Sequence, residues 1–364
     1  MSFEESGAAS AVEVKKLVED AIAQGGLSEA ELLRLVRSPL DALCSAADSI
    51  REHCCGNDFE LCSIMNVKSG HCSENCRFCA QSSHWGTAAN HYPFAEETAI
   101  VAQALRDAEY GSRRFSLVAS GQRVSRADID RACSAAKRIR AKTDIAICVS
   151  FGLLEREDYE LLRKAGVTRV HNNLETSRSF FPRICTTHGY DRKITALRDA
   201  RAAGMELCSG GIIGLGETWR DRIEMALELR RLEVASVPIN VLNPIPGTPL
   251  EHQDPLSPDD VRRTFALFRF ALPSATLRLA GGRTLMPDAG RACLKAGVNA
   301  AISGDMLTTA GFDIPSDIRM VTEEGFFAAR IEEDARAGGS AHASQAAPAP
   351  AETGTDAKED VYHE

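Results

Sequence analysis

The sequence contains no apolar run of the roughly 20 residues that a membrane-spanning helix needs. Its first residues, MSFEESGAASAVEVKK, include acidic side chains and lack the apolar segment of a secretory signal. We therefore expect a cytoplasmic protein. In that reducing compartment the 12 cysteines should be metal ligands, reactive thiols or buried apolar side chains rather than disulfides.

The sequence also has no excess of basic residues. The 51 acidic residues outnumber the 42 basic ones, which gives a formal net charge of −9. A nucleic acid or an anionic membrane surface would attract the opposite balance. We therefore expect no nucleic acid and no membrane as a partner, although a locally basic site for a carboxylate substrate remains compatible with this charge.

Short apolar segments with strand character alternate with amphipathic segments between about residue 60 and residue 310. The predicted strands are 61–67, 114–119, 145–150, 167–172, 206–210, 236–240, 276–279 and 300–303. The predicted helices between them include 96–109, 126–140, 157–164, 192–203, 218–232 and 258–271. Eight strand–helix alternations over roughly 250 residues favour an α/β fold of the (β/α)8 TIM-barrel type. An open doubly wound sheet has the same periodicity and stays open as the alternative.

The two ends of the chain differ from this central region. Residues 1–11 are small and polar and are predicted to be disordered, whereas 12–60 carry helical periodicity and should form helices that precede the barrel. The barrel is expected over 61–334. The tail, 335–364, is rich in small residues, proline and then acidic residues, so it lacks the apolar content to fold and is predicted to be disordered.

The most informative segment is GHCSENCRFCAQSSHW, in which Cys72, Cys76 and Cys79 follow the spacing C-x3-C-x2-C. Three thiolates this close together can hold three corners of a cubic [4Fe–4S] cluster and leave the fourth iron open to a small molecule. A ferredoxin would show a fourth cysteine nearby, and none follows here. A structural zinc site normally has four ligands, so zinc would need His71 or His84 as the fourth.

This spacing, with an aromatic residue before the last cysteine, resembles the radical S-adenosylmethionine superfamily. Further motifs resemble the biotin synthase family, in that family's order: VHNNLETS at 170–177, CSGGIIGLGET at 208–218, PINVL at 238–242, LRLAGGR at 277–283 and GDMLTT at 304–309. The resemblance implies cleavage of S-adenosylmethionine to a 5′-deoxyadenosyl radical, which breaks C–H bonds of dethiobiotin so that sulfur is inserted to give biotin. It also implies a homodimer and a flavodoxin or ferredoxin as electron donor.

Carried over by position, the resemblance implies a set of contacts with S-adenosylmethionine: Phe78, Ser120, Gly121, Asn173, Glu175, Lys193 and Ile212. Phe78 and Ile212 would flank the adenine, and Asn173 and Glu175 would contact the ribose. The run 118–121 would offer backbone carbonyls to the methionine amine. Lys193, beside Arg192, stands where the family usually has an arginine for the methionine carboxylate.

Two asparagines are expected at the substrate. Asn173 and Asn240 match the family positions that hold the ureido ring of dethiobiotin. An amide suits this role because it offers both a donor and an acceptor to a neutral urea. Without the surrounding motifs, Asn173 would be interpreted as a strand-end cap and Asn240 as a turn residue. Together with Arg278, they are the residues that we expect to take part directly in the reaction.

The family also carries an auxiliary [2Fe–2S] cluster that is thought to donate the inserted sulfur. The resemblance implies Cys148, Cys208 and Arg278 as its ligands, all in predicted strands and pointing into the barrel. The remaining ligand position is Ser116 here, and a serine oxygen is a harder ligand than a thiolate. Our hypothesis is that Cys185 replaces the missing thiolate. The alternatives are ligation by Ser116, or a buried free Cys185 and no auxiliary cluster.

Two other functions stay open. The departure at Ser116 is compatible with another small-molecule enzyme on the same scaffold, such as a hydrogenase-maturase-like protein. A non-catalytic iron–sulfur or zinc protein would instead have a closed metal site. The cysteines without motif support are interpreted as packing residues: Cys54, Cys55, Cys62, Cys133 and Cys293.

Overall fold

The computed structural model describes residues 9–304, 306–309 and 311–328. The strands within them are β1 Glu60–Lys68, β2 Arg114–Ala119, β3 Ala146–Ser150, β4 Val167–His171, β5 Glu206–Cys208, β6 Gly211–Ile213, β7 Ser236–Val241, β8 Thr276–Leu279 and β9 Ala300–Ser303. The helices that follow β1 are α4 Glu97–Glu109, α5 Arg126–Arg140, α6 Arg156–Lys164, α7 Tyr190–Ala202, α8 Trp219–Arg231, α9 Pro258–Ala271 and α10 Ile314–Glu323. Short 3₁₀ helices cover Phe181–Arg183, Arg283–Leu285 and Arg291–Ala296.

The strands form one parallel sheet in the order β5-β4-β3-β2-β1-β9-β8-β7-β6, and β5 also pairs with β7. This last pairing closes the sheet into a barrel. Because β6 follows β5 after two residues and pairs with the same neighbour β7, the two share one position in a ring of eight. The predicted (β/α)8 barrel is confirmed, and the open doubly wound sheet is wrong.

The predicted strand 206–210 ends earlier than expected, and the glycines after it explain why. A Cβ at Gly210 would lie 1.8 Å from the carbonyl oxygen of Pro238, and one at Gly211 would lie 2.4 Å from that of Glu175. Only glycine permits backbones to approach this closely. The break between β5 and β6 therefore lets the segment after β4 lie directly against the barrel wall.

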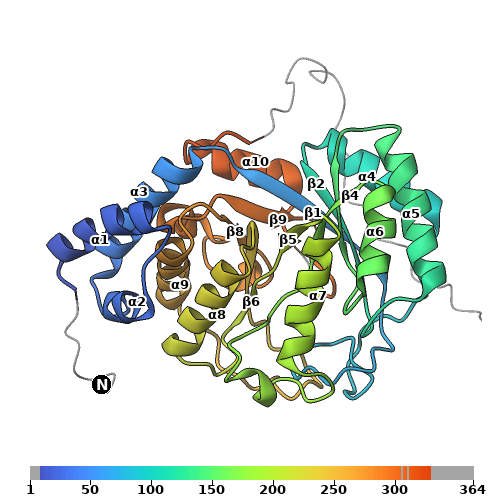
Figure 1. Cartoon of the computed structure of the whole chain (residues 1–364), viewed down its shortest axis with the longest axis horizontal. Helices are drawn as coiled ribbons and strands as arrows, with labels where there is room; N and C mark the ends of the chain where they lie inside the picture. The colour runs from blue at the N-terminus through green and yellow to red at the C-terminus, as the bar shows by residue number, and fades with distance from the viewer. Residues whose placement is uncertain (1–8, 305, 310, 329–364) are drawn as a thin grey trace, which may run out of the picture. The chain divides into compact units, whose positions relative to one another are not determined.

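Three described helices precede the barrel: α1 Ala11–Gln24, α2 Glu29–Leu35 and α3 Leu40–Cys55. Ser10 and Ser28 cap the first two through reciprocal bonds with the glutamates three residues later. The helices pack beside α8 and α9, as Figure 1 shows. Because Ser10 fixes the start of α1, this helix begins inside the segment 1–11; residues 1–8 and the predicted tail 335–364 lie outside the described residues.

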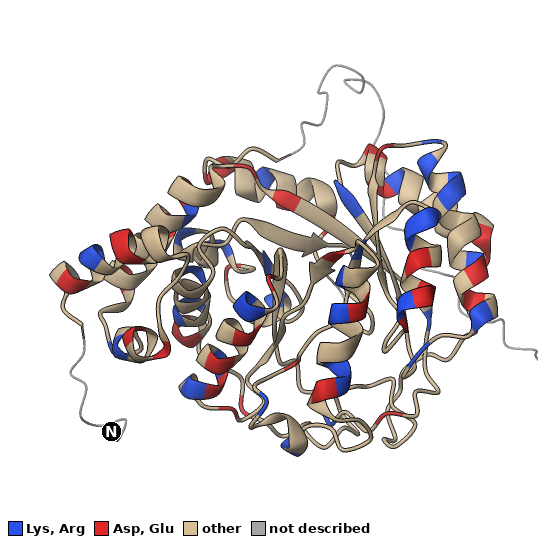
Figure 2. Ribbon diagram, viewed as in Figure 1, with Lys and Arg blue, Asp and Glu red and all other residues tan. Residues whose placement is uncertain are grey.

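The outer helices show no charged surface that would mark a binding site, whereas the direction of the strands indicates one end of the barrel. Figure 2 shows acidic and basic residues interspersed on the visible outer helices, without a surface of one sign. Among the helices that the structure describes, none combines the length and apolar character needed to cross a bilayer. Since all strands run in parallel, their carboxyl ends open at the same end of the barrel, where (β/α)8 enzymes carry their active sites.

Candidate active site

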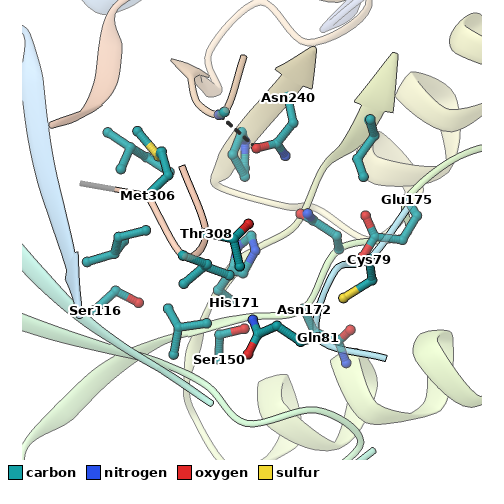
Figure 3. Close-up of a pocket in the computed structure, with 18 of the residues that line it drawn as sticks. Cys79, Gln81, Ser116, Ser150, His171, Asn172, Glu175, Asn240, Met306 and Thr308 are labelled. Carbon is teal, nitrogen blue, oxygen red and sulfur yellow. Dashed lines mark hydrogen bonds between the residues drawn. The ribbon is translucent and has the colours of Figure 1, made fainter. Parts of the chain in front are cut away.

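A cavity of about 400 Å³ extends into the barrel. Apart from Cys185, its walls include the residues predicted for both sites: Cys72, Cys76, Phe78, Cys79, Ser116, Ser120, Gly121, Cys148, Asn173, Glu175, Lys193, Cys208, Ile212, Asn240 and Arg278. Figure 3 shows side chains from separate strands and loops surrounding this one space. The fold therefore joins the three-cysteine loop to the inward-facing residues of the strands.

The three-cysteine loop follows β1, and backbone hydrogen bonds hold it in shape. The sulfur of Cys72 accepts the N–H groups of Glu74 and Gly121, and that of Cys79 accepts those of Gln81 and Ser82. Burial raises the pKa of Cys79 to about 11, so iron binding must displace a proton. Donors aimed at two of the sulfurs fit a cluster whose ligands carry negative charge.

The two histidines that would complete a zinc site are used elsewhere. His84 Nε2 lies 3.0 Å from the carbonyl oxygen of Ser73, and the ring of His71 packs edge-on against His91. Both are exposed, and neither lines the cavity with the three cysteines. The geometry therefore favours three protein ligands and an open position over a closed tetrahedral site.

Glu175 adopts a left-handed backbone conformation, with φ 73°, that is unusual for a residue other than glycine. Its N–H donates to the carbonyl of Gly210 (3.2 Å), and its own carbonyl accepts from Ile212 (2.8 Å). These bonds to the β5–β6 break fix the strained conformation and leave the carboxylate in the cavity wall. Cys79 lies close enough for this carboxylate to contribute to its raised pKa.

Lys193 is the basic residue that lies beside Glu175 in the cavity wall. Its Nζ lies 3.4 Å from Asn172 Oδ1 and 4.0 Å from a carboxylate oxygen of Glu175, whereas the neighbouring Arg192 is exposed. A buried ammonium next to a single carboxylate can accept a further anionic partner. The structure therefore supports Lys193, rather than Arg192, as the candidate for the methionine carboxylate.

The apolar residues predicted for the adenine lie together at the mouth. Phe78 and Ile212 both pack against a small apolar cluster that is separate from the main core: Phe180, Ile184, Leu215, Leu242 and Leu250. Ser120 adjoins this loop region, and its hydroxyl donates to the carbonyl of Gly70 (2.7 Å). An apolar surface beside polar groups suits a flat base attached to a charged chain.

Both predicted substrate asparagines already make hydrogen bonds to the backbone. Asn173 Oδ1 accepts from Gly210 N (3.0 Å), and Asn240 Oδ1 accepts from Gly281 N (2.9 Å; dashed in Figure 3). Asn240 Nδ2 also donates to Gly211 O (3.1 Å). An amide has two N–H donors and two acceptor lone pairs, so each side chain is fixed in orientation while retaining capacity for a ligand.

The floor of the cavity carries a group of arginines around one glutamate. Glu60 accepts hydrogen bonds from Arg278 and from Arg169 (2.8 Å), and Arg114 lies 3.7 Å away. Burial alone would raise the pKa of Glu60, but the three guanidinium groups lower it to about 2. Glu206 pairs with two of them. Three cations against two carboxylates leave an excess of positive charge that suits an anionic group.

Three thiols meet above these arginines, and one of them was not expected from the sequence. Burial, together with nearby Cys208 and Cys62, raises the pKa of Cys148 to about 12. His171 Nδ1 lies 3.4 Å from the sulfur of Cys208; despite burial, this histidine and two arginines lower the pKa of Cys208 to about 7. Cys62, which the sequence analysis interprets as a packing residue, lines the cavity with Cys148 and Cys208.

The two candidates for the missing ligand lie in different places. Ser116 on β2 lines the cavity and pairs in register with Cys148 on β3. Cys185 instead lies by Cys76, with its sulfur 3.4 Å from both Thr187 Oγ1 and His188 Nδ1. The structure therefore brings Ser116, but not Cys185, to the floor cysteines. Inward-facing alternation along β1 could have indicated Cys62, which shares a face with Ile64.

A parallel barrel with a three-cysteine loop after its first strand defines the radical S-adenosylmethionine class. The model of the Radical SAM superfamily matches residues 66–229, and that of the Biotin and Thiamin Synthesis associated domain matches residues 238–327. The chain is 49% identical to the biotin synthase of Brachyspira hyodysenteriae over 86% of this chain and 95% of that protein. It is 48% identical to the biotin synthase of Akkermansia muciniphila over 85% and 97%. The chain belongs to the biotin synthase family.

Solved structures of other enzymes share the fold. Methylornithine synthase (PylB) superposes with a TM-score of 0.74 at 20% identity, covering 86% of this chain and 98% of that one. HydG, a maturase of the [FeFe]-hydrogenase, gives 0.72 at 18% identity over 87% and 75%. These identities show a common fold and no more, so the maturase-like alternative is not favoured over a family matched at 49% identity.

Proposed function

We propose that this chain converts dethiobiotin to biotin by radical S-adenosylmethionine chemistry. A single observation carries the proposal: one cavity is lined at its mouth by Cys72, Cys76 and Cys79 and at its floor by further cysteines and arginines. A small substrate in this cavity has a place for radical generation on one side and a sulfur source on the other. The mouth cluster supplies the electron that cleaves S-adenosylmethionine.

The side chains of the cavity position the two organic molecules. Lys193 holds the carboxylate of the cofactor, Glu175 and Asn173 bind its ribose, and Phe78 lies against its adenine. Asn173 and Asn240 present their remaining amide groups to the ureido ring of the substrate. Since backbone groups already fix both amides, little side-chain freedom is lost on binding.

We further propose that Cys62, Cys148, Cys208 and Arg278 hold the auxiliary iron–sulfur cluster. Two features support this assignment: the three thiols influence one another's ionisation, and the excess of buried arginine compensates an anionic cluster. Cys62 restores on β1 the thiolate that Ser116 lacks on β2. A thiolate is also the softer and better ligand for iron in such a cluster.

An anaerobic assay of the reconstituted full chain tests the reaction. With dethiobiotin, S-adenosylmethionine and dithionite, we expect biotin and 5′-deoxyadenosine to form together. Deoxyadenosine without biotin would contradict the proposed substrate. Absence of deoxyadenosine from protein with a full mouth cluster would contradict the radical chemistry itself.

Iron and sulfide counts test the auxiliary ligands. Cys62→Ala should lose the auxiliary iron and sulfide but keep the mouth cluster and the cleavage of S-adenosylmethionine. The matched variants Ser116→Ala and Cys185→Ala should keep the auxiliary iron. The reverse result, with loss in Cys185→Ala and retention in Cys62→Ala, would return the assignment to Cys185.

The assembly and the electron donor are proposals as well. We propose a cytoplasmic homodimer that receives electrons from a flavodoxin or ferredoxin. Light scattering of the purified chain tests the dimer, since a monomer mass at micromolar concentration contradicts it. Replacement of dithionite by reduced flavodoxin or ferredoxin in the assay tests the donor.

A further inference from the structure

A buried glutamate lies inside the three-cysteine loop. Glu74 stands between Cys72 and Cys76, and its side chain is 8% exposed. Its backbone carbonyl accepts a hydrogen bond from the hydroxyl of Ser82 (2.6 Å), which ties it to the end of the same loop. Because a buried carboxylate needs hydrogen-bond donors, the partners of this side chain show what holds the loop in place.

The carboxylate of Glu74 is bonded to two other loops of the barrel mouth. Its Oε1 accepts from Gln122 Nε2 (2.7 Å), in the loop after β2. Its Oε2 accepts from Thr187 Oγ1 (2.5 Å) and from His188 Nδ1, in the segment before α7. Since a carboxylate can only accept, Nδ1 of His188 carries the proton in this contact. Three side-chain donors from two loops thus converge on one buried carboxylate.

Each of these two loops also leads to a group that we expect at the cofactor. Gln122 directly follows Gly121, whose N–H donates to the sulfur of Cys72. His188 stands two residues before the start of α7, and Lys193 lies near the start of that helix. Glu74 therefore joins the loop that holds the iron to both segments that receive the methionine end of the cofactor.

We propose that Glu74 is a positioning residue for S-adenosylmethionine. It fixes the separation between the open iron of the mouth cluster and Lys193, which the methionine end of the cofactor has to bridge. Glu74 is not among the residues that line the cavity, so it acts through the loops that it joins. This inference rests on the proposed function, because it needs the cofactor at the mouth.

Glu74→Gln tests this role. Whichever way the new amide turns, its NH₂ group meets a donor, either Gln122 on one side or Thr187 and His188 on the other. We expect the KM for S-adenosylmethionine to rise about tenfold, as for loss of one charged hydrogen bond, with the mouth iron retained and the KM for dethiobiotin unchanged. Binding is measured without turnover by EPR: the signal of the reduced mouth cluster should respond to S-adenosylmethionine at about ten times the wild-type concentration.

Two variants of His188 repeat the test from the other side of the contact. His188→Ala removes the donor to Glu74 and should raise the same KM. His188→Asn places an amide N–H close to the position of Nδ1 and should restore most of the affinity. Asp191→Asn is the matched control, because it removes an exposed carboxylate, paired with Arg178, from the first turn of α7. We expect it to bind the cofactor as wild type does.

A double variant distinguishes positioning from a general loss of stability. If Glu74 acts by holding the iron at the right separation from Lys193, Glu74→Gln has little left to disturb once Lys193→Met is present. The KM of the double variant for S-adenosylmethionine should then be close to that of Lys193→Met alone. Effects that multiply, to about a hundredfold, would mean that the two residues act independently and would overturn the inference.

The remaining outcomes separate this inference from the proposed function. A wild-type KM in both Glu74→Gln and His188→Ala would overturn it while leaving the reaction intact. Loss of the mouth iron from both variants would also overturn it, because Glu74 would then be needed to hold the cluster rather than to position the cofactor. Wild-type protein whose reduced mouth cluster does not respond to S-adenosylmethionine would instead contradict the proposed function.

A metal count tests a different role for the same side chains. Glu74, Cys185 and His188 offer ligand atoms within 4.8 Å of one another. One zinc ion per chain, retained after dialysis against a chelator and absent from His188→Ala, would overturn the proposal, since a metal-bound Nδ1 has no proton to donate to Glu74. We expect no stoichiometric zinc.

Discussion

Two groups of cysteines face the same cavity, but they are built in different ways. At the mouth, Cys72, Cys76 and Cys79 lie within eight residues on a loop, and backbone N–H groups donate to the sulfurs of Cys72 and Cys79. At the floor, Cys62 and Cys148 lie on strands, as does Cys208, and each is fixed by strand register. Buried arginines, rather than amides, provide the positive charge there.

Because the floor residues come from several strands, we expect ligands to be exchanged there more easily than on the mouth loop, without a change of fold. A loop motif depends on its spacing, so loss of one mouth cysteine cannot be replaced from elsewhere on the loop. At the floor, several strands point side chains into one space, and β1 can supply the thiol that β2 lacks. Under the proposed ligation, Cys62 on β1 takes the place of Ser116 on the adjacent strand β2.

The largest expected effect separates the two sites completely. Cys76→Ala should abolish cleavage of S-adenosylmethionine, because two remaining thiolates cannot hold the cubane at the mouth. Iron and sulfide counting, with 5′-deoxyadenosine measured in parallel, should show loss of the mouth cluster and retention of the floor iron. Loss of both clusters together would break the comparison by showing that the sites assemble as one unit. Cys133→Ala provides the control for a cysteine outside the cavity.

The next largest effect is on the free energy of unfolding, to which Glu60 at the floor contributes in a pH-dependent way. The folded-state pKa of Glu60 is about 2, below the ordinary value of 4.5, so this carboxylate stabilises the fold fully above about pH 4.5. The contribution, about 3 kcal/mol at neutral pH from the size of the shift, falls as the pH falls from 4.5 toward 2. Urea unfolding of cluster-free wild type and Glu60→Gln should therefore show a difference at pH 7 that shrinks by pH 3.

A constant difference between pH 7 and pH 3 would show that Glu60 acts through packing rather than charge. Glu97→Gln is the matched control: this glutamate pairs with Arg138 at the surface, where ion pairs contribute little. We expect the control to unfold as wild type does throughout this range.

The same contrast explains how far the sequence alone could lead. The mouth was predictable because its ligands are contiguous, and the barrel was predictable because apolar strands and amphipathic helices alternate clearly. Cys62 was missed because no family motif covers it, and the alternation along β1 that puts it on one face with Ile64 does not by itself say which face points into the barrel. Cys185 was expected at the floor, yet Asn75 of the cysteine loop bonds to Thr186 through both its amide nitrogen (2.7 Å) and its oxygen (2.9 Å). This contact ties the segment with Cys185 to the mouth.

The smallest expected effect is a weaker binding of S-adenosylmethionine at the mouth, with no change at the floor. Lys193→Met removes the buried ammonium beside Glu175, and we expect the KM for S-adenosylmethionine to rise about tenfold, as for loss of one charged hydrogen bond. Lys193→Arg should restore most of the affinity, because arginine keeps the charge and binds carboxylates well. Both variants should retain the iron of the floor and an unchanged KM for dethiobiotin. If Lys193→Met instead weakened dethiobiotin binding and left the cofactor unaffected, the ammonium would belong to the carboxylate of the substrate, and the assignment of the mouth to the cofactor would have to be reversed.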